Sequence, residues 1–90
     1  MLKNYTEVAV AEMLPRVLEE YRKQNPGVCD CERCREDIMA IALNRLPPRY
    51  VVTDEGTIYT KVIFDQIGGR AEVTAAILQG IKVVSAHPRH

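Results

Sequence analysis

Long apolar runs are missing from this 90-residue sequence, and so is excess charge of either sign. No segment approaches the roughly eighteen apolar residues that a membrane-spanning helix requires, and the first ten residues, MLKNYTEVAV, lack the layout of a signal peptide. Lysine and arginine together number 12, as do aspartate and glutamate, so the chain as a whole has no field that would attract nucleic acid. We therefore expect a cytoplasmic protein that binds neither membranes nor DNA directly.

Catalytic signatures are missing as well, since no nucleophile, histidine and acid can be placed together and no glycine-rich phosphate loop follows a strand. Internal repeats and linkers are absent, which predicts one domain over residues 1–90. Apolar residues make up 47%, as in ordinary folded proteins, yet a chain this short buries only roughly 60–65% of its unfolded surface. We predict a binding protein rather than an enzyme, with a metal or a second subunit supporting the small core.

Helical periodicity predicts an all-α fold of three to four helices. Asn4 with Glu7 is typical of a helix N-terminus, and apolar residues then recur at helical spacing from about residue 5 to residue 23, where the sequence NPG follows as a stop. A second helix is predicted from Glu32 to Leu46, because the two prolines that follow cannot continue it.

The segment PPRYVVTDEGTIYT, residues 47–60, is typical of extended chain with a turn at Asp54-Glu55-Gly56. A short hairpin that pairs Val51-Val52 with Ile58-Tyr59 fits this pattern. Thr60 is then the candidate cap of a third helix. Gly68-Gly69 interrupts its apolar face at a cost of about 1 kcal/mol per glycine, so a break there is an alternative to one continuous helix.

All the cysteines lie in the stretch GVCDCERCRED, as Cys29, Cys31 and Cys34. If a helix begins near Glu32, Cys31 and Cys34 lie on the same side and the three sulfurs converge. Thiolates select zinc or iron–sulfur clusters, and zinc takes four tetrahedral ligands, so the spacing predicts a structural zinc site with three of its ligands. The alternatives are three partly buried free thiols, or a redox-active site, which the spacing CDCERC does not favour.

The fourth zinc ligand is not part of this cluster. The candidates are His87, His90, the carboxylates of Asp30 and Glu32, a water molecule, and a residue of a second subunit. His87 is preferred because it follows the last predicted helix, whose end could fold back onto the start of the second helix. A closed site of this kind would contribute roughly 10 kcal/mol or more of folding free energy.

A second informative stretch is NRLPPRYVVT, residues 44–53, which combines two arginines, two prolines and a tyrosine. Arginine forms bidentate hydrogen bonds with phosphate and with the edge of guanine, and Tyr50 offers a face on which a base can stack. Arg45 and Arg49 could therefore hold a guanine nucleotide. The plainer alternative is an exposed turn with solvated arginines and a tyrosine packed on the core.

Five segments in this order, NYTEVAVAEMLPRVLEEY, CDCERC, DIMAIALNRLPPRYVVT, IYTK and VVSAHPRH, resemble the late competence development protein ComFB family over nearly the whole chain. The most specific features are the CxCxxC cluster, the basic-Leu-Pro-Pro-basic-Tyr-Val-Thr pattern and the Pro-Arg after the last helix. The resemblance implies a small, mainly helical homodimer of the bacterial cytoplasm, associated with competence for DNA uptake, in which cysteines hold zinc in at least some members.

Other members of the family resemble receptors for the second messenger cyclic di-GMP. Carried over by position, the resemblance implies metal ligands at Cys29, Cys31 and Cys34. It implies nucleotide contacts at Arg45, Pro48, Arg49, Tyr50, Thr53 and Arg89. Some members supply a further cysteine after the last helix where this chain has none, so His87 or His90 would have to replace it.

Two functions are therefore expected. The first is a cyclic di-GMP receptor with a structural zinc, linked to competence or motility, whose output is a changed affinity for a protein partner. The alternative is a zinc-stabilised adaptor of the competence machinery with no nucleotide ligand. The predicted dimer interface comprises the apolar faces of the first helix and of the last helix around Gly80, because glycine permits close helix approach.

Overall fold

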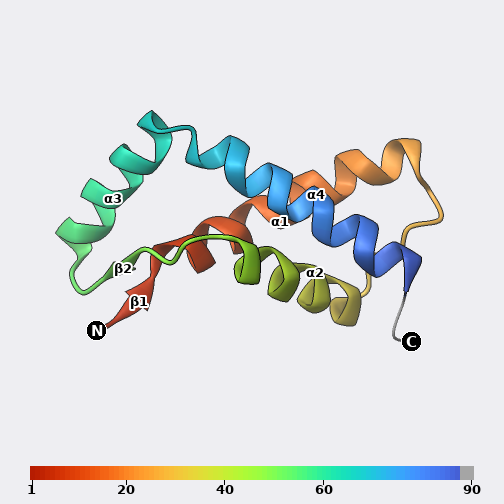
Figure 1. Cartoon of the computed structure of the whole chain (residues 1–90), viewed down its shortest axis with the longest axis horizontal. Coiled ribbons are helices and arrows are strands. Elements are labelled where there is room, and N and C mark those ends of the chain that lie inside the picture. The colour runs from red at the N-terminus through yellow and green to blue at the C-terminus, as the bar shows by residue number, and fades with distance from the viewer. Residues whose placement is uncertain (88–90) are drawn as a thin grey trace.

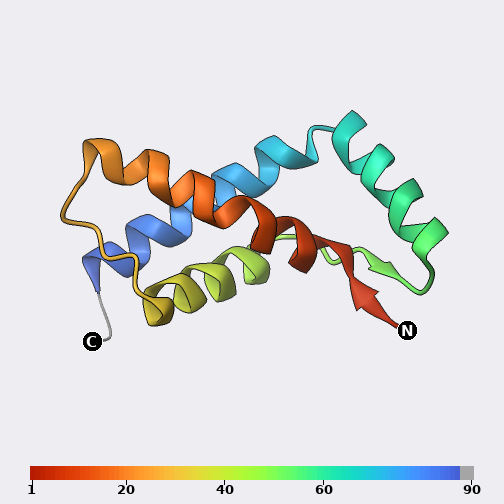
Figure 2. The same cartoon turned by 180° about the vertical axis from the view of Figure 1, so that it is seen from behind.

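The computed structural model describes residues 1–87, which form four helices and a small two-stranded sheet (Figures 1 and 2). The elements are β1 (Lys3–Asn4), α1 (Tyr5–Gln24), α2 (Glu32–Arg45), β2 (Tyr50–Val51), α3 (Asp54–Gln66) and α4 (Gly69–Ala86). The predicted helical fold is confirmed, and a strand occurs near the predicted Val51-Val52 as β2, paired with a strand, β1, that was not predicted. Within residues 1–87, no helix is both long enough and apolar enough to cross a membrane.

Helix α1 begins and ends where its local sequence predicts. The side chain of Asn4 accepts a hydrogen bond from the Thr6 amide at 3.1 Å and so caps the helix. The helix continues through Pro15 and ends at Asn25, whose amide donates back to the carbonyls of Tyr21 and Arg22. The same Asn4 side chain accepts from the Arg49 amide at 2.7 Å, which ties residues 47–51 to the start of α1.

The predicted hairpin between Val51-Val52 and Ile58-Tyr59 is wrong. Val51 pairs with Lys3 and Tyr50 with Asn4, in antiparallel register, and the residues expected to form the turn are the first turn of α3. Thr53 caps this helix, because its Oγ1 accepts from the Gly56 amide at 2.9 Å. A threonine cap followed by two acidic residues favours a helix start, and here this signal outweighs the turn preference of Asp-Glu-Gly.

The expected alternative of a break at Gly68-Gly69 is confirmed, since α3 ends before it and α4 starts after it. Gly68 adopts a φ of 77°, a left-handed conformation that suits glycine. Thr60, expected as a cap, lies inside α3.

The core lies between α1, α2 and α4, and the fully buried side chains include Val10 and Leu18 of α1, Ile38 of α2, and Ile77 and Ile81 of α4. Gly80 is buried against α2, where an added Cβ would lie 3.0 Å from the Ile38 carbonyl oxygen. The close helix approach expected at Gly80 therefore occurs inside the chain, and a dimer interface at this position is wrong.

Helix α3 lies at one end of the molecule (Figure 1) and is attached through Phe64, the one buried side chain assigned to it. The ring of Phe64 packs edge-on against Tyr5, with the centroids 5.5 Å apart. The Arg49 guanidinium carbon lies over the Phe64 ring, 5.6 Å from its centroid. These contacts join α3 to the start of α1 and to the segment before β2.

Candidate metal centre

The cysteine cluster occupies the connection between α1 and α2 and the first turn of α2. Cys29 and Cys31 lie in the connection and Cys34 lies in the helix, where burial is nearly complete at 2% exposure. Cys29 is half-buried and Cys31 is exposed. The connection thus places the sulfurs at the edge of the core, with one sulfur inside it and one in solvent.

The three Sγ atoms lie within 4.8 Å of one another, so the predicted convergence is confirmed. Cys31 is the N-cap of α2, and its Sγ accepts a hydrogen bond from the Cys34 amide at 3.5 Å. The Cys31 amide in turn donates to the Sγ of Cys29, also at 3.5 Å. Backbone donors aimed at sulfur favour the thiolate form, which is the form that binds metals.

Two arginines hold the connection in place, and the sequence predicted no role for either of them. Arg22 of α1 donates from Nε to the Val28 carbonyl at 2.8 Å and from Nη1 to the Asp30 carboxylate at 3.2 Å. Arg35 of α2 donates from Nε to the Asp30 carbonyl at 2.9 Å. Asp30, one of the candidates for the fourth ligand, is therefore engaged by arginines from both flanking helices, and its carboxylate forms ion pairs with both.

The environments of the thiols differ. The hydrogen bond from the Cys34 amide, followed by that with Cys29, lowers the pKa of the Cys31 thiol. Burial, followed by the neighbouring Cys29 and Cys31, raises the pKa of the Cys34 thiol to about 12. A thiol of this kind stays protonated at neutral pH unless a metal ion replaces its proton. The donor set of three converging sulfurs thus fits a thiophilic cation such as zinc, with each cysteine supplying one thiolate.

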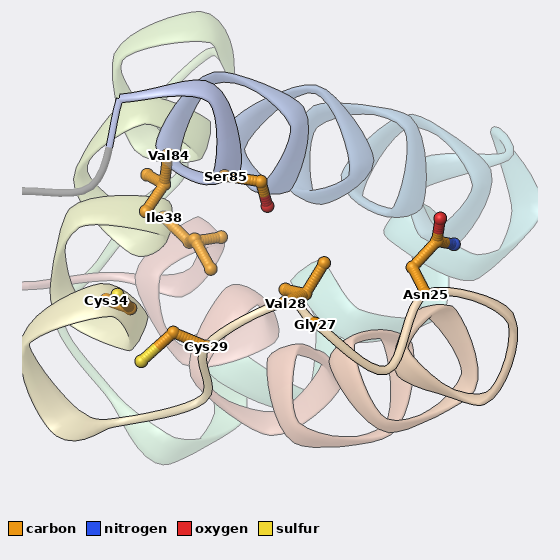
Figure 3. Close-up of a pocket in the computed structure, with 8 residues that line it drawn as sticks. All are labelled: Asn25, Gly27, Val28, Cys29, Cys34, Ile38, Val84 and Ser85. Atoms are coloured by element: carbon orange, nitrogen blue, oxygen red, sulfur yellow. The ribbon is translucent and has the colours of Figure 1, made fainter.

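The end of α4 lies close to the cluster. A cavity of about 460 Å³ is bounded by Cys29 and Cys34 on one side and by Val84 and Ser85 of α4 on another (Figure 3). The expected return of the last helix to the start of the second is therefore confirmed. His87 follows directly as the exposed C-cap of α4, but it does not belong to the group of atoms within 4.8 Å. His87 as the fourth ligand stays a prediction, and His90 lies outside the described residues.

The residues predicted to contact a nucleotide have different environments. Thr53 caps α3 and Arg49 packs over Phe64, so both have roles within the chain. Arg45 and Pro48 are exposed, and Arg89 lies outside the described residues. Tyr50 is 64% exposed, so the alternative in which it packs on the core is wrong.

Tyr50 lines a cavity of about 540 Å³ together with Lys3, Glu7 and Met39, among others. This cavity lies between the sheet and the helices α1 and α2. A cavity therefore lies beside Tyr50, the one aromatic residue of the stretch NRLPPRYVVT, although the acidic Glu7 also borders this cavity.

Comparison with known proteins agrees with this architecture. The family described as "Late competence development protein ComFB" matches residues 3–88. "Competence protein ComFB" of Bacillus subtilis (strain 168) is 27% identical over 88 residues, covering 98% of this chain and 86% of that protein. The solved structure of the late competence protein ComFB from Bacillus subtilis superposes with a TM-score of 0.79 at 28% identity, over 98% of this chain and 92% of that one. With the helical order and the cysteine cluster in place, the chain belongs to the late competence development protein ComFB family.

Proposed function

We propose that this chain is a metal-stabilised adaptor of the competence machinery, which acts by binding another protein rather than by catalysis. The observation that carries the proposal is the cluster of three sulfurs within 4.8 Å, in a chain of the competence-related ComFB family. The three sulfurs come from the connection between α1 and α2 and from α2 itself, and the end of α4 borders the adjoining cavity, so a metal there fixes the connection to α2 beside α4. Its role is structural, because it joins elements of the core instead of facing a substrate.

The metal is zinc, and one C-terminal histidine, His87 or His90, completes its ligand set. Three thiolates and one imidazole form a common closed zinc site. Val84 and Ser85 border the same cavity as Cys29 and Cys34, and His87 is two residues further along the chain.

Cobalt substitution tests the ligand set, because the visible spectrum of Co²⁺ reports both tetrahedral geometry and the number of thiolates. The wild-type protein should bind about one equivalent of Co²⁺ or Zn²⁺ per chain, and Cys34→Ser should bind it far more weakly. His87→Ala and His90→Ala separate the two histidines, with Lys82→Ala as an exposed control on α4. An unchanged cobalt spectrum in both histidine variants would leave a carboxylate such as that of Glu32, water or a second subunit as the source of the fourth ligand.

Transformation assays test the adaptor role. Deleting the gene from its naturally transformable host should lower the frequency of DNA uptake, and the wild-type gene should restore it. Cys34→Ser should restore it poorly, because the variant lacks the metal that holds the helices together. Normal uptake of DNA in the deletion strain would contradict the competence role. It would not affect the metal site, which the metal-binding assay tests separately.

A cyclic di-GMP receptor is the second candidate, favoured by the exposed ring of Tyr50 beside a cavity of about 540 Å³ that Lys3 also borders. Stacking on tyrosine and a cationic contact to phosphate are the interactions that a guanine dinucleotide needs. Arg49 is a poor position for the test, because its loss would also disturb the packing of Phe64.

Calorimetric titration of the zinc-loaded protein with cyclic di-GMP decides between the two candidates. Tyr50→Ala and Arg45→Ala are the informative variants, since both side chains are exposed, and GTP is the specificity control. Binding of cyclic di-GMP that is lost in Tyr50→Ala would replace the adaptor with a receptor. No heat in any of the proteins would support the adaptor.

A further inference from the structure

Two of the three thiols lie at the start of α2 and differ sharply in their access to solvent. Cys31 is the N-cap of the helix, and Cys34 lies within its first turn. Cys31 is exposed, whereas Cys34 is buried at 2% exposure. The Cys34 amide donates a hydrogen bond to the Cys31 Sγ at 3.5 Å, so the two residues are already in contact. The helix start thus presents one sulfur to solvent and holds a second one nearby in the core.

We propose that Cys31 is an oxidation site, at which a hydroperoxide produces a reversible disulfide between Cys31 and Cys34 and so expels the metal. The oxidation step depends only on the two thiols, whereas the loss of the metal rests on the proposed zinc site. The spacing CDCERC by itself does not favour redox chemistry, because it shows neither which thiol is exposed nor where the helix begins. The structure supplies both facts.

The geometry favours Cys34 as the partner of Cys31. All three Sγ atoms lie within 4.8 Å of one another, against about 2 Å for the sulfurs of a disulfide. Residues three apart at the start of a helix are neighbours, as a bridge between their side chains requires. A cavity of about 460 Å³ borders Cys34 (Figure 3), so there is unfilled space beside the buried sulfur.

Cys29 is the competing partner, and the bracing of the connection disfavours it. A bridge from Cys29 to Cys31 would span Asp30 alone, and this residue is held at both its carboxylate and its carbonyl. Arg22 donates to the carboxylate at 3.2 Å, and Arg35 donates to the carbonyl at 2.9 Å. Closing the shorter bridge would have to distort this braced segment, whereas the bridge to Cys34 leaves Asp30 outside the closed loop.

The chemistry proceeds in two displacement steps. The Cys31 sulfur attacks one oxygen of hydrogen peroxide, the O–O bond breaks, and the leaving oxygen takes up a proton and departs as water, which leaves a sulfenic acid on Cys31. The Cys34 sulfur then attacks the Cys31 sulfur, so that the S–S bond forms and the S–O bond breaks, and the oxygen leaves as a second water. The two cysteines lose two electrons in total, and the peroxide gains them. The two protons come from the thiols or, where a metal has replaced those protons, from solvent.

Oxidation removes two of the three thiolate ligands at once. Cys29 alone cannot hold the metal, so the connection loses its link to α2 and the protein loses the stability that the metal supplies. A thiol reductant restores the pair by exchange, after which the metal can return. An accessible cysteine next to a resolving cysteine is the arrangement found in proteins that sense oxidants. The adaptor would thereby be switched off under oxidising conditions.

Peptide mapping of the zinc-loaded, full-length protein tests the proposal. The protein is treated with hydrogen peroxide, its free thiols are blocked with iodoacetamide, and it is cleaved before Asp30 and after Arg33, which places each cysteine on its own peptide. Mass spectrometry should find the Cys31 peptide linked to the Cys34 peptide. A chelating dye should record zinc release in step with this disulfide, and dithiothreitol with added zinc should reverse both changes.

Two variants separate the two chemical steps. Cys34→Ser lacks the resolving thiol, so dimedone should label the sulfenic acid on Cys31 at least about tenfold more than Cys29. Cys29→Ser is the matched control, because it removes a cysteine of the same cluster and keeps the reacting pair, so it should still form the disulfide. Circular dichroism shows whether each variant is folded, and the mapping of the wild type stands without either of them.

Three results would overturn the proposal: a main product that links Cys29 to either other cysteine, zinc release by peroxide without a Cys31–Cys34 disulfide, or no oxidation at peroxide concentrations that oxidise free glutathione. A protein that takes up no zinc but forms the Cys31–Cys34 disulfide would support the oxidation site and contradict the zinc site. A protein that binds zinc and forms no disulfide would do the reverse, so the two hypotheses fail separately.

Discussion

Gly69 shows how a single residue positions a helix. The ring of Phe64 fills the space that a Cβ at Gly69 would occupy, so α4 begins in direct contact with the residue that anchors α3. Glycine is required here for close approach, whereas at the neighbouring Gly68 it is required for the positive φ. Two adjacent glycines therefore serve two different physical needs.

We predict that Gly69→Ala lowers the free energy of unfolding by about 2 kcal/mol, because the added methyl group must push the Phe64 ring out of its site. Urea denaturation measures the change. Gly27→Ala is the control, since nothing lies within 4 Å of a Cβ placed there. A Gly69→Ala protein as stable as the Gly27→Ala protein would contradict this account of the junction between α3 and α4.

Thr53 has a structural role that the sequence did not predict. Its hydroxyl caps α3 at 2.9 Å from the Gly56 amide, although the family resemblance implied a nucleotide contact. We expect Thr53→Ala to cost about 1 kcal/mol of stability in the absence of any nucleotide, and Thr53→Ser to cost much less. Thermal unfolding of the two variants side by side gives the answer. Equal stability of all three proteins would mean that the cap contributes nothing.

The connection between α1 and α2 depends on bracing from both helices. Arg22 and Arg35 bond to its carbonyls and to Asp30, so side chains of both flanking helices hold the segment that carries Cys29 and Cys31. Such outer contacts orient metal ligands and influence affinity. The sequence shows that the two arginines are present, but it does not show which backbone carbonyls accept their hydrogen bonds.

We predict that Arg22→Ala weakens zinc binding by about 10- to 100-fold, because the connection loses its link to α1. Competition with a chelating dye measures the affinity. Lys23→Ala is the neighbouring control, since Lys23 forms only an exposed ion pair with Glu20, and such pairs contribute little. Equal affinities for the two variants would show that Arg22 does not support the site.

Across the whole molecule, the metal site and the core form one unit. Cys34 is buried among the apolar residues of the core, and the cavity beside it is bordered by the end of α4. Loss of the metal should therefore affect all the packed helices together rather than only the connection.

We expect chelation of the metal to lower the melting temperature by at least about 15 °C in a single transition, because metal binding contributes folding free energy. Calorimetry with and without chelator measures the shift, and added zinc should restore it. Cys34→Ser should not respond to chelator. An identical melting curve for the metal-free wild type would exclude a structural metal.

Much of this arrangement could be predicted from local sequence. Caps, apolar spacing and the NPG stop defined α1, and two prolines ended α2, because these signals act over a few residues. The spacing of Cys29, Cys31 and Cys34 predicted their convergence for the same reason, since one turn of chain sets the geometry. Residues 54–60 were predicted wrongly as a turn and a strand instead of the start of α3, because Thr53 followed by acidic residues competes with the turn signal of Asp-Glu-Gly, and only the pairing of Tyr50-Val51 with Lys3-Asn4 shows which signal prevails.

Contacts between distant residues were decided by the tertiary structure alone. The Asn4 side chain bonds to the Arg49 amide, and Gly80 meets Ile38, because the packing of α1, α2 and α4 brings together segments that are some forty residues apart. The same packing covers the face of α4 around Gly80, and it leaves most of the large apolar side chains of α3 exposed to solvent. Apolar periodicity marks which residues avoid water, but it does not say which neighbour covers them, since that depends on how the whole chain closes around its core.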